Sequence, residues 1–334
     1  MTVTQQRPDT VAKLLTATDP ALAARLHGEL SAVEELLRRT ISDGPALMAE
    51  AAGYLLAAGG KRMRPLLVLL GAEFGDPARP AVRQAAASVE LIHAATLYHD
   101  DVMDGAPLRH GVPSAHVRWN TKIAILAGDY LFTKAASLDL PQKAKTEQAQ
   151  CVARLVAGQI AETAGPAAGV DPLDHHLGVL HDKSASLIRL SARLGGLCSG
   201  AGRRVSGMLA EYGELLGMAF QLSDDLIDVL SEPSESGKGA GTDLREGVLT
   251  LPVLHALALD GGRLAELLAS GPLTDPARHA EALELLRRSP AIGSARAEVE
   301  RYAGEAAAIA RALPPRPARE VLLALCEHVV HRTI

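Results

Sequence analysis

Apolar residues recur at helical spacing along almost the whole 334-residue chain, and this pattern restricts the fold more than any other feature. No segment alternates apolar and polar residues in the manner of a strand, and no fixed-period repeat is present. The chain holds only one Trp, five Tyr and three Phe, so aliphatic side chains must fill the core, which favours helices over sheets. The predicted helices cover residues 21–58 with a break near Ser42–Pro45, 63–74, 80–104, 120–138, 145–163, 173–200, 204–230, 250–269, 276–288, 293–312 and 317–332.

Breaks rich in glycine and proline separate these helices, but none resembles a linker between two domains. We therefore expect one all-α domain over residues 1–334, with residues 1–20 flexible. The longest break, residues 231–247, lies inside a series of helices and is interpreted as a mobile loop beside the active site.

Composition excludes several classes of protein. The net charge of −5 disfavours a broad basic surface for nucleic acid. Three cysteines, far apart and in no CxxC arrangement, indicate a reducing compartment and no zinc site. No apolar run reaches the ~18 residues of a membrane span, and the polar N-terminus lacks a signal-peptide core. These features predict a cytoplasmic protein without integral membrane contact.

Two aspartate clusters of the form DDxxD lie 124 residues apart. The first comprises Asp100, Asp101 and Asp104, and the second comprises Asp224, Asp225 and Asp228. Residues i and i+4 of an α-helix differ by only ~40° in direction, so the outer aspartates of each cluster face the same way.

A solvated acidic face is the ordinary explanation of one such cluster. Here each cluster adjoins the C-terminal end of its predicted helix, where the helix dipole disfavours anions. Each also places three like charges within two turns of an otherwise apolar helix. Hard divalent cations relieve this repulsion, and Mg²⁺ commonly binds carboxylates together with substrate phosphates. Two such clusters suggest a polynuclear metal site that grips a diphosphate.

Cationic residues suited to a diphosphate occur near both clusters. Residues 59–65, GGKRMRP, place three positive charges behind two glycines. Arg109-His110-Gly111 follows the first cluster, Lys183-Ser184 interrupts a predicted helix, and Lys238 and Arg245 follow the second cluster. Any one of these is ordinarily a solvated charge, whereas together they match an anionic substrate.

The sequence resembles the trans-isoprenyl diphosphate synthases, also called polyprenyl synthetases. The strings that carry the resemblance occur in the order of that family: GGKRMRP at 59–65, HDDVMD at 99–104, LRHGVPS at 108–114, AGDYLF at 127–132, GQIAE at 158–162, KSASL at 183–187, GMAFQLSDDLID at 217–228 and GKGAGTDLREG at 237–247. The resemblance implies the isoprenoid synthase fold, a bundle of about ten or more helices around a central substrate cavity. It also implies Mg²⁺-dependent condensation of isopentenyl diphosphate with an allylic prenyl diphosphate.

The resemblance assigns roles to individual residues. The six aspartates are the expected Mg²⁺ ligands, with three ions per site. The expected isopentenyl diphosphate site comprises Gly60, Lys61, Arg64, His93 and His110. The expected allylic diphosphate site comprises Arg109, Lys183, Ser184, Gln221 and Lys238, of which Lys183, Ser184 and Gln221 form the catalytic set.

Three positions depart from the family pattern. His110 stands where many members have a second Arg, Ser184 where Thr is usual, and Val248 where several members have Lys. Ser184 keeps the hydroxyl group, whereas the charge of His110 depends on pH. All six aspartates remain, so an active enzyme is expected.

Two alternatives stay open at this point. A class I terpene cyclase would share the helical architecture, but nine aromatic residues are few for steering carbocations, and the second cluster is a full DDxxD. A non-catalytic subunit of a heteromeric synthase would be expected to lack aspartates that are present here.

Residues before the first cluster are expected to set the length of the product. Thr96 and Ala95, four and five positions before Asp100, are small, so the product tail should continue along the helix past Ile92. One helical turn of ~5.4 Å accommodates about one isoprene unit. We expect a product of C20 or longer, with about C30–C40 favoured. A homodimer is expected from the resemblance and from the prevalence of two-fold oligomers.

Overall fold

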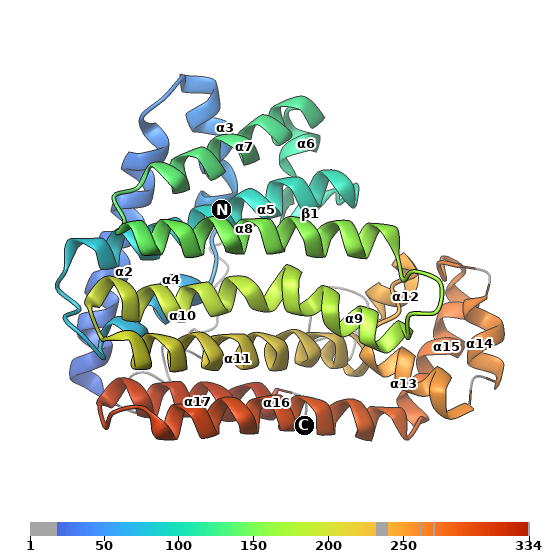
Figure 1. Ribbon diagram of the computed structural model, residues 1–334. Coiled ribbons are helices and arrows are strands. Elements are labelled where there is room, and N and C mark those ends of the chain that lie inside the picture. Colours follow the sequence, from blue (N-terminus) through green and yellow to red (C-terminus); the bar gives the residue numbers. More distant parts are fainter. Residues whose placement is uncertain (1–18, 232–239, 261, 270, 333–334) are drawn as a thin grey trace. The chain divides into compact units, whose positions relative to one another are not determined.

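The computed structural model describes residues 19–231, 240–260, 262–269 and 271–332 (Figure 1). Within these ranges the chain is helical, apart from one two-stranded hairpin and the connecting turns. The all-α prediction is confirmed. In the described part of the chain, no helix has both the length and the apolar character that crossing a bilayer requires.

The helices follow one another with short connections. Their bounds are α2 Pro20–Ser42, α3 Ala46–Ala57, α4 Met63–Ala72, α5 Pro80–Met103, α6 Ala115–Arg118, α7 Thr121–Ser137, α8 Gln142–Ala164, α9 Pro172–Leu180, the π-helix η1 His181–Ala185, α10 Ser186–Ser199, α11 Arg203–Leu230, α12 Thr242–Glu246, α13 Leu251–Asp260, α14 Gly262–Leu268, α15 Pro276–Arg288, α16 Ala291–Ala312 and α17 Pro317–His331. The strands are β1 Leu108–Arg109 and β2 Val112–Pro113, and they pair antiparallel.

Contacts divide the described residues into two compact units. Unit 1 comprises the described residues up to Val152, together with Leu187–Gly213 and Ala310–Leu322. Unit 2 comprises Ala153–Ser186 and the described residues within Glu214–Ile309 and from Leu323 onward. Helices α8 and α11 each contribute residues to both units. The single-domain organisation stays a prediction.

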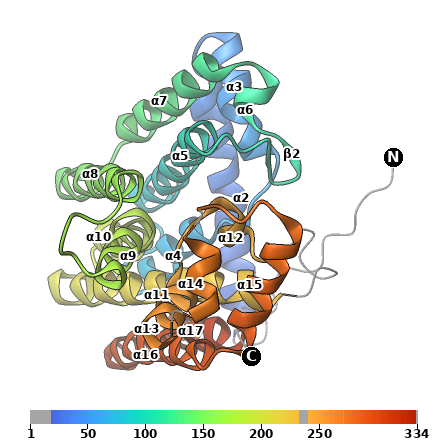
Figure 2. The ribbon, with the colours of Figure 1, turned by 90° about the vertical axis from the view of Figure 1, so that its right-hand side faces the viewer.

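Helix α5 is the centre of unit 1. It packs against α7, α4 and α2, and Figures 1 and 2 both show α5 alongside α7. Small side chains allow this close packing: a Cβ atom on Gly128 of α7 would lie 2.4 Å from the His99 ring of α5. In the same way, a Cβ atom on Gly195 of α10 would lie 2.2 Å from the Val68 carbonyl of α4.

Unit 2 surrounds the C-terminal end of α11. Helices α13, α14 and α15 pack against one another there, and α9 packs against α13 (Figure 2). Arg287 of α15 donates hydrogen bonds to the carbonyls of Val229 and Ser231, at 2.8 Å each. Because the last carbonyls of a helix lack partners within the helix, these bonds fix the end of α11.

The observed helices agree with the predicted ones over most of the chain, and several local features differ, among them the short helix α6, which lies outside the predicted helices. The predicted helix 173–200 contains the π-helical turn η1. Thr242–Glu246, predicted to be loop, forms the short helix α12, and the hairpin at residues 108–113 was not expected. The mobility predicted for 231–247 is untested, and residues 1–18 and 232–239 lie outside the described ranges.

We predict that Tyr98→Phe destabilises unit 1 by about 1–3 kcal/mol, because it leaves buried polar groups without a partner. The fully buried Tyr98 hydroxyl contacts the carbonyls of Ala51 and Ala52 and accepts a hydrogen bond from the Leu55 amide at 3.2 Å. Urea unfolding would measure the loss. Tyr54→Phe is the control, since its exposed hydroxyl donates to the Pro113 carbonyl, and water can replace that bond. Equal losses in both variants would contradict the prediction.

Candidate active site

The first aspartate cluster lies at the C-terminal end of α5, as predicted. Asp101 is only 1% exposed; its Oδ1 accepts a hydrogen bond from Arg109 Nε at 2.7 Å and forms an ion pair with Arg109 Nη2 at 2.6 Å. Its other oxygen, Oδ2, is buried and has no hydrogen-bond partner among the described residues. Asp100 lies in the last turn of α5, and Asp104 is exposed at its C-cap. The cluster therefore contains three carboxylates, and the buried Oδ2 of Asp101 accepts no hydrogen bond from the described residues.

A tight hairpin places Arg109 next to this cluster. The strand pairs Leu108 with Pro113 and Arg109 with Val112, which leaves His110 and Gly111 as a two-residue loop. Their φ angles are +51° and +78°, and positive φ at both loop positions is what a type I′ turn requires. His110 therefore occupies a strained turn position, and its side chain is exposed.

The three positively charged residues of the GGKRMRP segment, Lys61, Arg62 and Arg64, have different surroundings. Arg62, itself at φ +47°, donates to Glu34 of α2, to Glu90 of α5 at 2.8 Å and to the Leu56 carbonyl at 2.8 Å. Gly60 has φ +155°, and a Cβ atom there would lie 2.7 Å from the Arg62 guanidinium. Arg62 thus fixes the segment in place, while Lys61 points to an exposed position.

Arg64 differs from Arg62 because its buried Nε has no hydrogen-bond partner among the described residues. Burial lowers the pKa of Arg64, although the nearby Glu90 carboxylate opposes that shift. Burial also lowers the pKa of His93 well below its usual range, and the neighbouring Arg64, His110, Arg109 and Arg62 lower it further. His93 is consequently neutral at pH 7. These side chains gather around one place in unit 1, as an anion site requires.

The second aspartate cluster lies in the last two turns of α11, in unit 2. Asp225 is buried; its Oδ2 lies 3.1 Å from His176 Nε2. The two oxygens of Asp228 accept the backbone amides of Thr242 and Asp243, at 3.1 Å each, and so cap α12. Asp228 therefore joins the second cluster to the start of that short helix.

The remaining aspartate of this cluster, Asp224, pairs with an arginine near the C-terminus. Arg332 Nη2 lies 2.5 Å from Asp224 Oδ1, and the same guanidinium stacks on the Phe220 ring, 4.4 Å from its centroid. Phe220 and Asp224 are one helical turn apart, so Arg332 covers one face of α11.

The predicted catalytic residues of unit 2 lie on two elements. Lys183 and Ser184 belong to η1, and the Lys183 ammonium pairs with Glu162 of α8. Gln221 lies half-buried on α11, one turn before the second cluster. Lys238 lies outside the described residues, so its predicted role is untested.

The two aspartate clusters offer carboxylate oxygens, which are the type of ligand that Mg²⁺ prefers. The described residues include no group of three or more His, Cys, Asp or Glu side chains arranged to hold a metal ion. Mg²⁺ rarely uses a cage built wholly from protein, because it keeps waters and takes one or two carboxylates together with substrate phosphates. The buried Asp101 Oδ2, without a donor, belongs to such a carboxylate set.

The residues predicted to set product length lie on one stretch of α5. Ile92 and Ala95 are completely buried, whereas Thr96 is half-buried and its hydroxyl donates to the His93 carbonyl at 2.8 Å. Ala95 and Thr96 thus place small side chains on this stretch of helix, five and four residues before Asp100.

Sequence reasoning missed four residues that hold these segments. Arg62 was counted among the diphosphate cations, yet three protein partners take up its donors. The other three, His176, Arg154 and Arg332, were not singled out, and His176 contacts Asp225. Each of the four pairs with at least one residue 27 or more positions away in sequence, so local patterns carry no signal for those pairs.

Known proteins are similar to this chain both in sequence and in structure. The sequence model of the family described as Polyprenyl synthetase matches residues 45–286. A nonaprenyl diphosphate synthase of Mycobacterium tuberculosis is 43% identical over 97% of this chain and 98% of its own length. A solved geranylgeranyl pyrophosphate synthase of Corynebacterium glutamicum, complexed with calcium and isoprenyl diphosphate, is 40% identical with a TM-score of 0.84 over 94% of this chain and 98% of its own. A solved decaprenyl diphosphate synthase of Rhodobacter capsulatus is 31% identical, with a TM-score of 0.86. The similarity covers 94% of this chain and 99% of the other chain.

The fold is that of a prenyltransferase of the isoprenoid synthase type. The chain belongs to the polyprenyl synthetase family, which is Mg²⁺-dependent. The family, the fold and the enzyme class predicted from the motifs are confirmed, and the terpene cyclase and non-catalytic alternatives are not favoured. The central cavity and the individual site residues remain predictions.

We predict that His93 makes folding stability depend on pH. Because the pKa of His93 is lower in the folded than in the unfolded chain, the unfolded chain binds more protons below pH ~6.5, and stability falls as the pH falls from there. His93→Gln should remove up to about 1.4 kcal/mol per pH unit from that slope. Urea unfolding between pH 7 and pH 5.5 would measure it. His27→Gln, at an exposed position of α2, should keep the wild-type slope. A wild-type slope in His93→Gln would refute the prediction.

Proposed function

We propose that this protein condenses isopentenyl diphosphate with an allylic prenyl diphosphate and releases a linear polyprenyl diphosphate of long chain length. The allylic C–O bond breaks and diphosphate leaves with the bonding electrons. The double bond of isopentenyl diphosphate then attacks the allylic cation, and loss of a proton, accepted by the released diphosphate, restores an alkene. Membership of the polyprenyl synthetase family supports this reaction.

In this proposal, Gly60, Lys61, Arg64, His93 and His110 bind isopentenyl diphosphate. The observation that carries the assignment is the buried Nε of Arg64, which has no hydrogen-bond partner among the described residues. A buried charged donor without an acceptor is costly, and phosphate oxygens would satisfy it. Neutral His93 can donate one N–H bond to the same anion without adding to the positive charge.

Arg109, Lys183, Ser184, Gln221 and Lys238 are proposed to hold the allylic diphosphate. The six aspartates, Asp100, Asp101, Asp104, Asp224, Asp225 and Asp228, are proposed to hold three Mg²⁺ ions. When bound, Mg²⁺ would neutralise the negative charge that grows on the leaving diphosphate. Calcium in the solved relative from C. glutamicum supports a divalent metal at this kind of site. Arg109 would keep Asp101 oriented for this purpose, and Ser184 and Gln221 would face the developing cation.

The product is proposed to be about C30–C40, because Ala95 and Thr96 leave room along α5 at ~5.4 Å per helical turn. Similarity to nonaprenyl and decaprenyl diphosphate synthases supports a long chain, although the geranylgeranyl synthase is also similar. We also propose that the enzyme is a homodimer in the cytoplasm.

The proposed reaction is tested by incubating the purified protein with Mg²⁺, isopentenyl diphosphate and allylic primers, and then analysing products by mass. Asp100→Ala and Asp224→Ala should each lower turnover by at least about a hundredfold, because metal stabilisation of the leaving group is lost. Helical content should stay unchanged. The matched controls Glu35→Ala in unit 1 and Glu281→Ala in unit 2 remove exposed carboxylates and should leave turnover intact. Near-normal turnover of either aspartate variant in saturating Mg²⁺ would rule out the two-cluster site.

Product length is tested by Ala95→Phe. An aromatic ring here should block the product tail and shorten the product by one or more C5 units. Because Ala95 is fully buried, the larger ring also strains the core by about 1–3 kcal/mol. Thr96→Phe, at a half-buried position, is the second variant and should shorten the product with less strain. Unchanged product masses in both folded variants would show that another wall limits the chain.

A further inference from the structure

Three residues of α8 form a line along one face of that helix. Arg154, Gly158 and Glu162 are spaced four residues apart, which places them on the same side of an α-helix. Each contacts the π-helix η1, and all of these residues belong to unit 2. The line therefore acts as a support for η1, the segment that carries Lys183 and Ser184.

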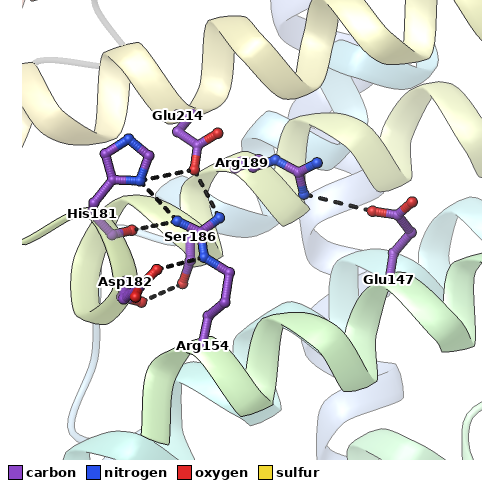
Figure 3. A network of polar contacts seen from close by, with 7 residues as sticks. All are labelled: Glu147, Arg154, His181, Asp182, Ser186, Arg189 and Glu214. Carbon is purple, nitrogen blue, oxygen red and sulfur yellow. Dashed lines mark hydrogen bonds and ion pairs between the residues drawn. The ribbon is translucent and has the colours of Figure 1, made fainter. Parts of the chain in front are cut away.

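Arg154 makes the largest number of these contacts, as Figure 3 shows. Its Nε donates to Asp182 Oδ1 at 2.6 Å, and its Nη1 donates to Glu214 of α11 at 2.8 Å. Its Nη2 lies 2.8 Å from His181 Nδ1 and donates to the His181 carbonyl at 3.1 Å. All three guanidinium nitrogens are thus used, and two of them bind the first two residues of η1.

The next residue of η1 is Lys183, and the rest of the line holds it. A Cβ atom on Gly158 would lie 2.6 Å from the Lys183 backbone nitrogen, so only glycine lets α8 approach η1 this closely. One turn further along α8, Glu162 pairs with the Lys183 ammonium. The backbone and the side chain of Lys183 are both positioned from α8.

The π-helical turn needs this support. In η1 the Ser186 amide donates to the His181 carbonyl five residues earlier, and the Ser186 hydroxyl donates to the Asp182 carbonyl at 2.6 Å. Single π-turns inside α-helices are rare and occur mostly at functional sites. Such unfavourable backbone persists only where surrounding contacts hold it. The Arg154 guanidinium binds the same His181 carbonyl that accepts the π-type bond.

From this geometry we propose that Arg154 is a positioning residue: it holds η1 in its π-helical form and thereby aims Lys183 at the allylic diphosphate. This inference rests on the proposed function, in which Lys183 binds that diphosphate. Arg154 touches no reacting atom in this account. It acts on the substrate only through the backbone and neighbours of Lys183.

The chemistry of the contact requires arginine. The planar guanidinium group donates to Asp182, His181 and Glu214 in fixed directions. A lysine ammonium is a single point charge and cannot reach all three partners. Arg154→Lys keeps the positive charge but loses the fork, so it tests orientation apart from charge. Burial lowers the pKa of Arg154, but the hydrogen bonds to Asp182 and Glu214 outweigh this effect and raise the pKa overall. Arg154 is therefore charged.

The experiment is steady-state kinetics of Arg154→Lys with each substrate varied in turn. We expect the Michaelis constant for the allylic diphosphate to rise about tenfold, because a small displacement of Lys183 weakens its contact. The constant for isopentenyl diphosphate should change less than about twofold. The matched control is Arg189→Lys, since Arg189 also pairs with a glutamate of α8, Glu147, at 3.6 Å (Figure 3). This control should leave both constants unchanged.

A double-mutant cycle separates positioning from general stabilisation. If Arg154 acts through Lys183, Arg154→Lys should add little to the effect of Lys183→Ala on the allylic constant. A full additional loss in the Lys183→Ala background would overturn the proposal, as would a wild-type allylic constant in Arg154→Lys alone.

Two further outcomes are informative. If Lys183→Ala is itself without effect on the allylic constant, the role assigned to Lys183 under the proposed function is wrong, and this inference is wrong with it. If Arg154→Lys does not fold, Glu214→Gln provides the same readout, because it removes the carboxylate charge that pairs with Arg154 Nη1 and leaves Asp182 in place. A folded Glu214→Gln with wild-type allylic kinetics would then refute the proposal.

Discussion

The Arg62 guanidinium holds in place the GGKRMRP segment of unit 1, which is proposed to bind isopentenyl diphosphate. It bonds Glu34 of α2, the carbonyl of Leu56 at the end of α3 and Glu90 of α5, so three elements meet on one side chain. Glu90 is only 4% exposed, and burial raises its pKa, an effect that the neighbouring Arg62 and Arg64 oppose. Removing one partner from a buried pair costs about 3–5 kcal/mol, so the connection is firm. The two neighbouring arginines therefore differ: Arg62 stabilises the fold, and Arg64 is proposed to bind a ligand.

Unit 2 uses the same device. Arg154 forks onto His181, Asp182 and Glu214 and holds a π-helical turn, just as Arg62 holds a segment with positive φ. In both units, an irregular stretch of backbone carries cations proposed to bind diphosphate, and an arginine fixes it. Arg62 belongs to its stretch, whereas Arg154 binds η1 from the neighbouring helix α8. Arginine suits this task because its donors are planar and point in set directions. The expected benefit is a set of phosphate-binding groups that are oriented before substrate arrives.

Hydrophobic periodicity and capping residues were sufficient to predict most of the helices. Asp19, Asn120, Asp171 and Asp275 cap helices with their side chains, and three of these precede a proline in the first turn. The motif strings predicted the family, and both aspartate clusters lie at helix ends as expected. The π-turn was missed because it shifts hydrogen bonds inside a continuous helix without changing the apolar pattern. The different fates of Arg62 and Arg64 were missed because they depend on Glu34 and Glu90, which are distant in sequence.

Arg64, whose Nε has no hydrogen-bond acceptor among the described residues, is proposed to bind a diphosphate, while Arg62 is structural. Calorimetric titration of isopentenyl diphosphate into the wild type and into Arg64→Gln tests this proposal most directly, with thermal unfolding of each variant measured in parallel. Arg64→Gln should weaken binding at least about tenfold, the equivalent of one charge-assisted hydrogen bond, and should keep the wild-type melting temperature. Arg62→Gln should instead lower the melting temperature. Wild-type affinity for isopentenyl diphosphate in a folded Arg64→Gln variant would contradict the account.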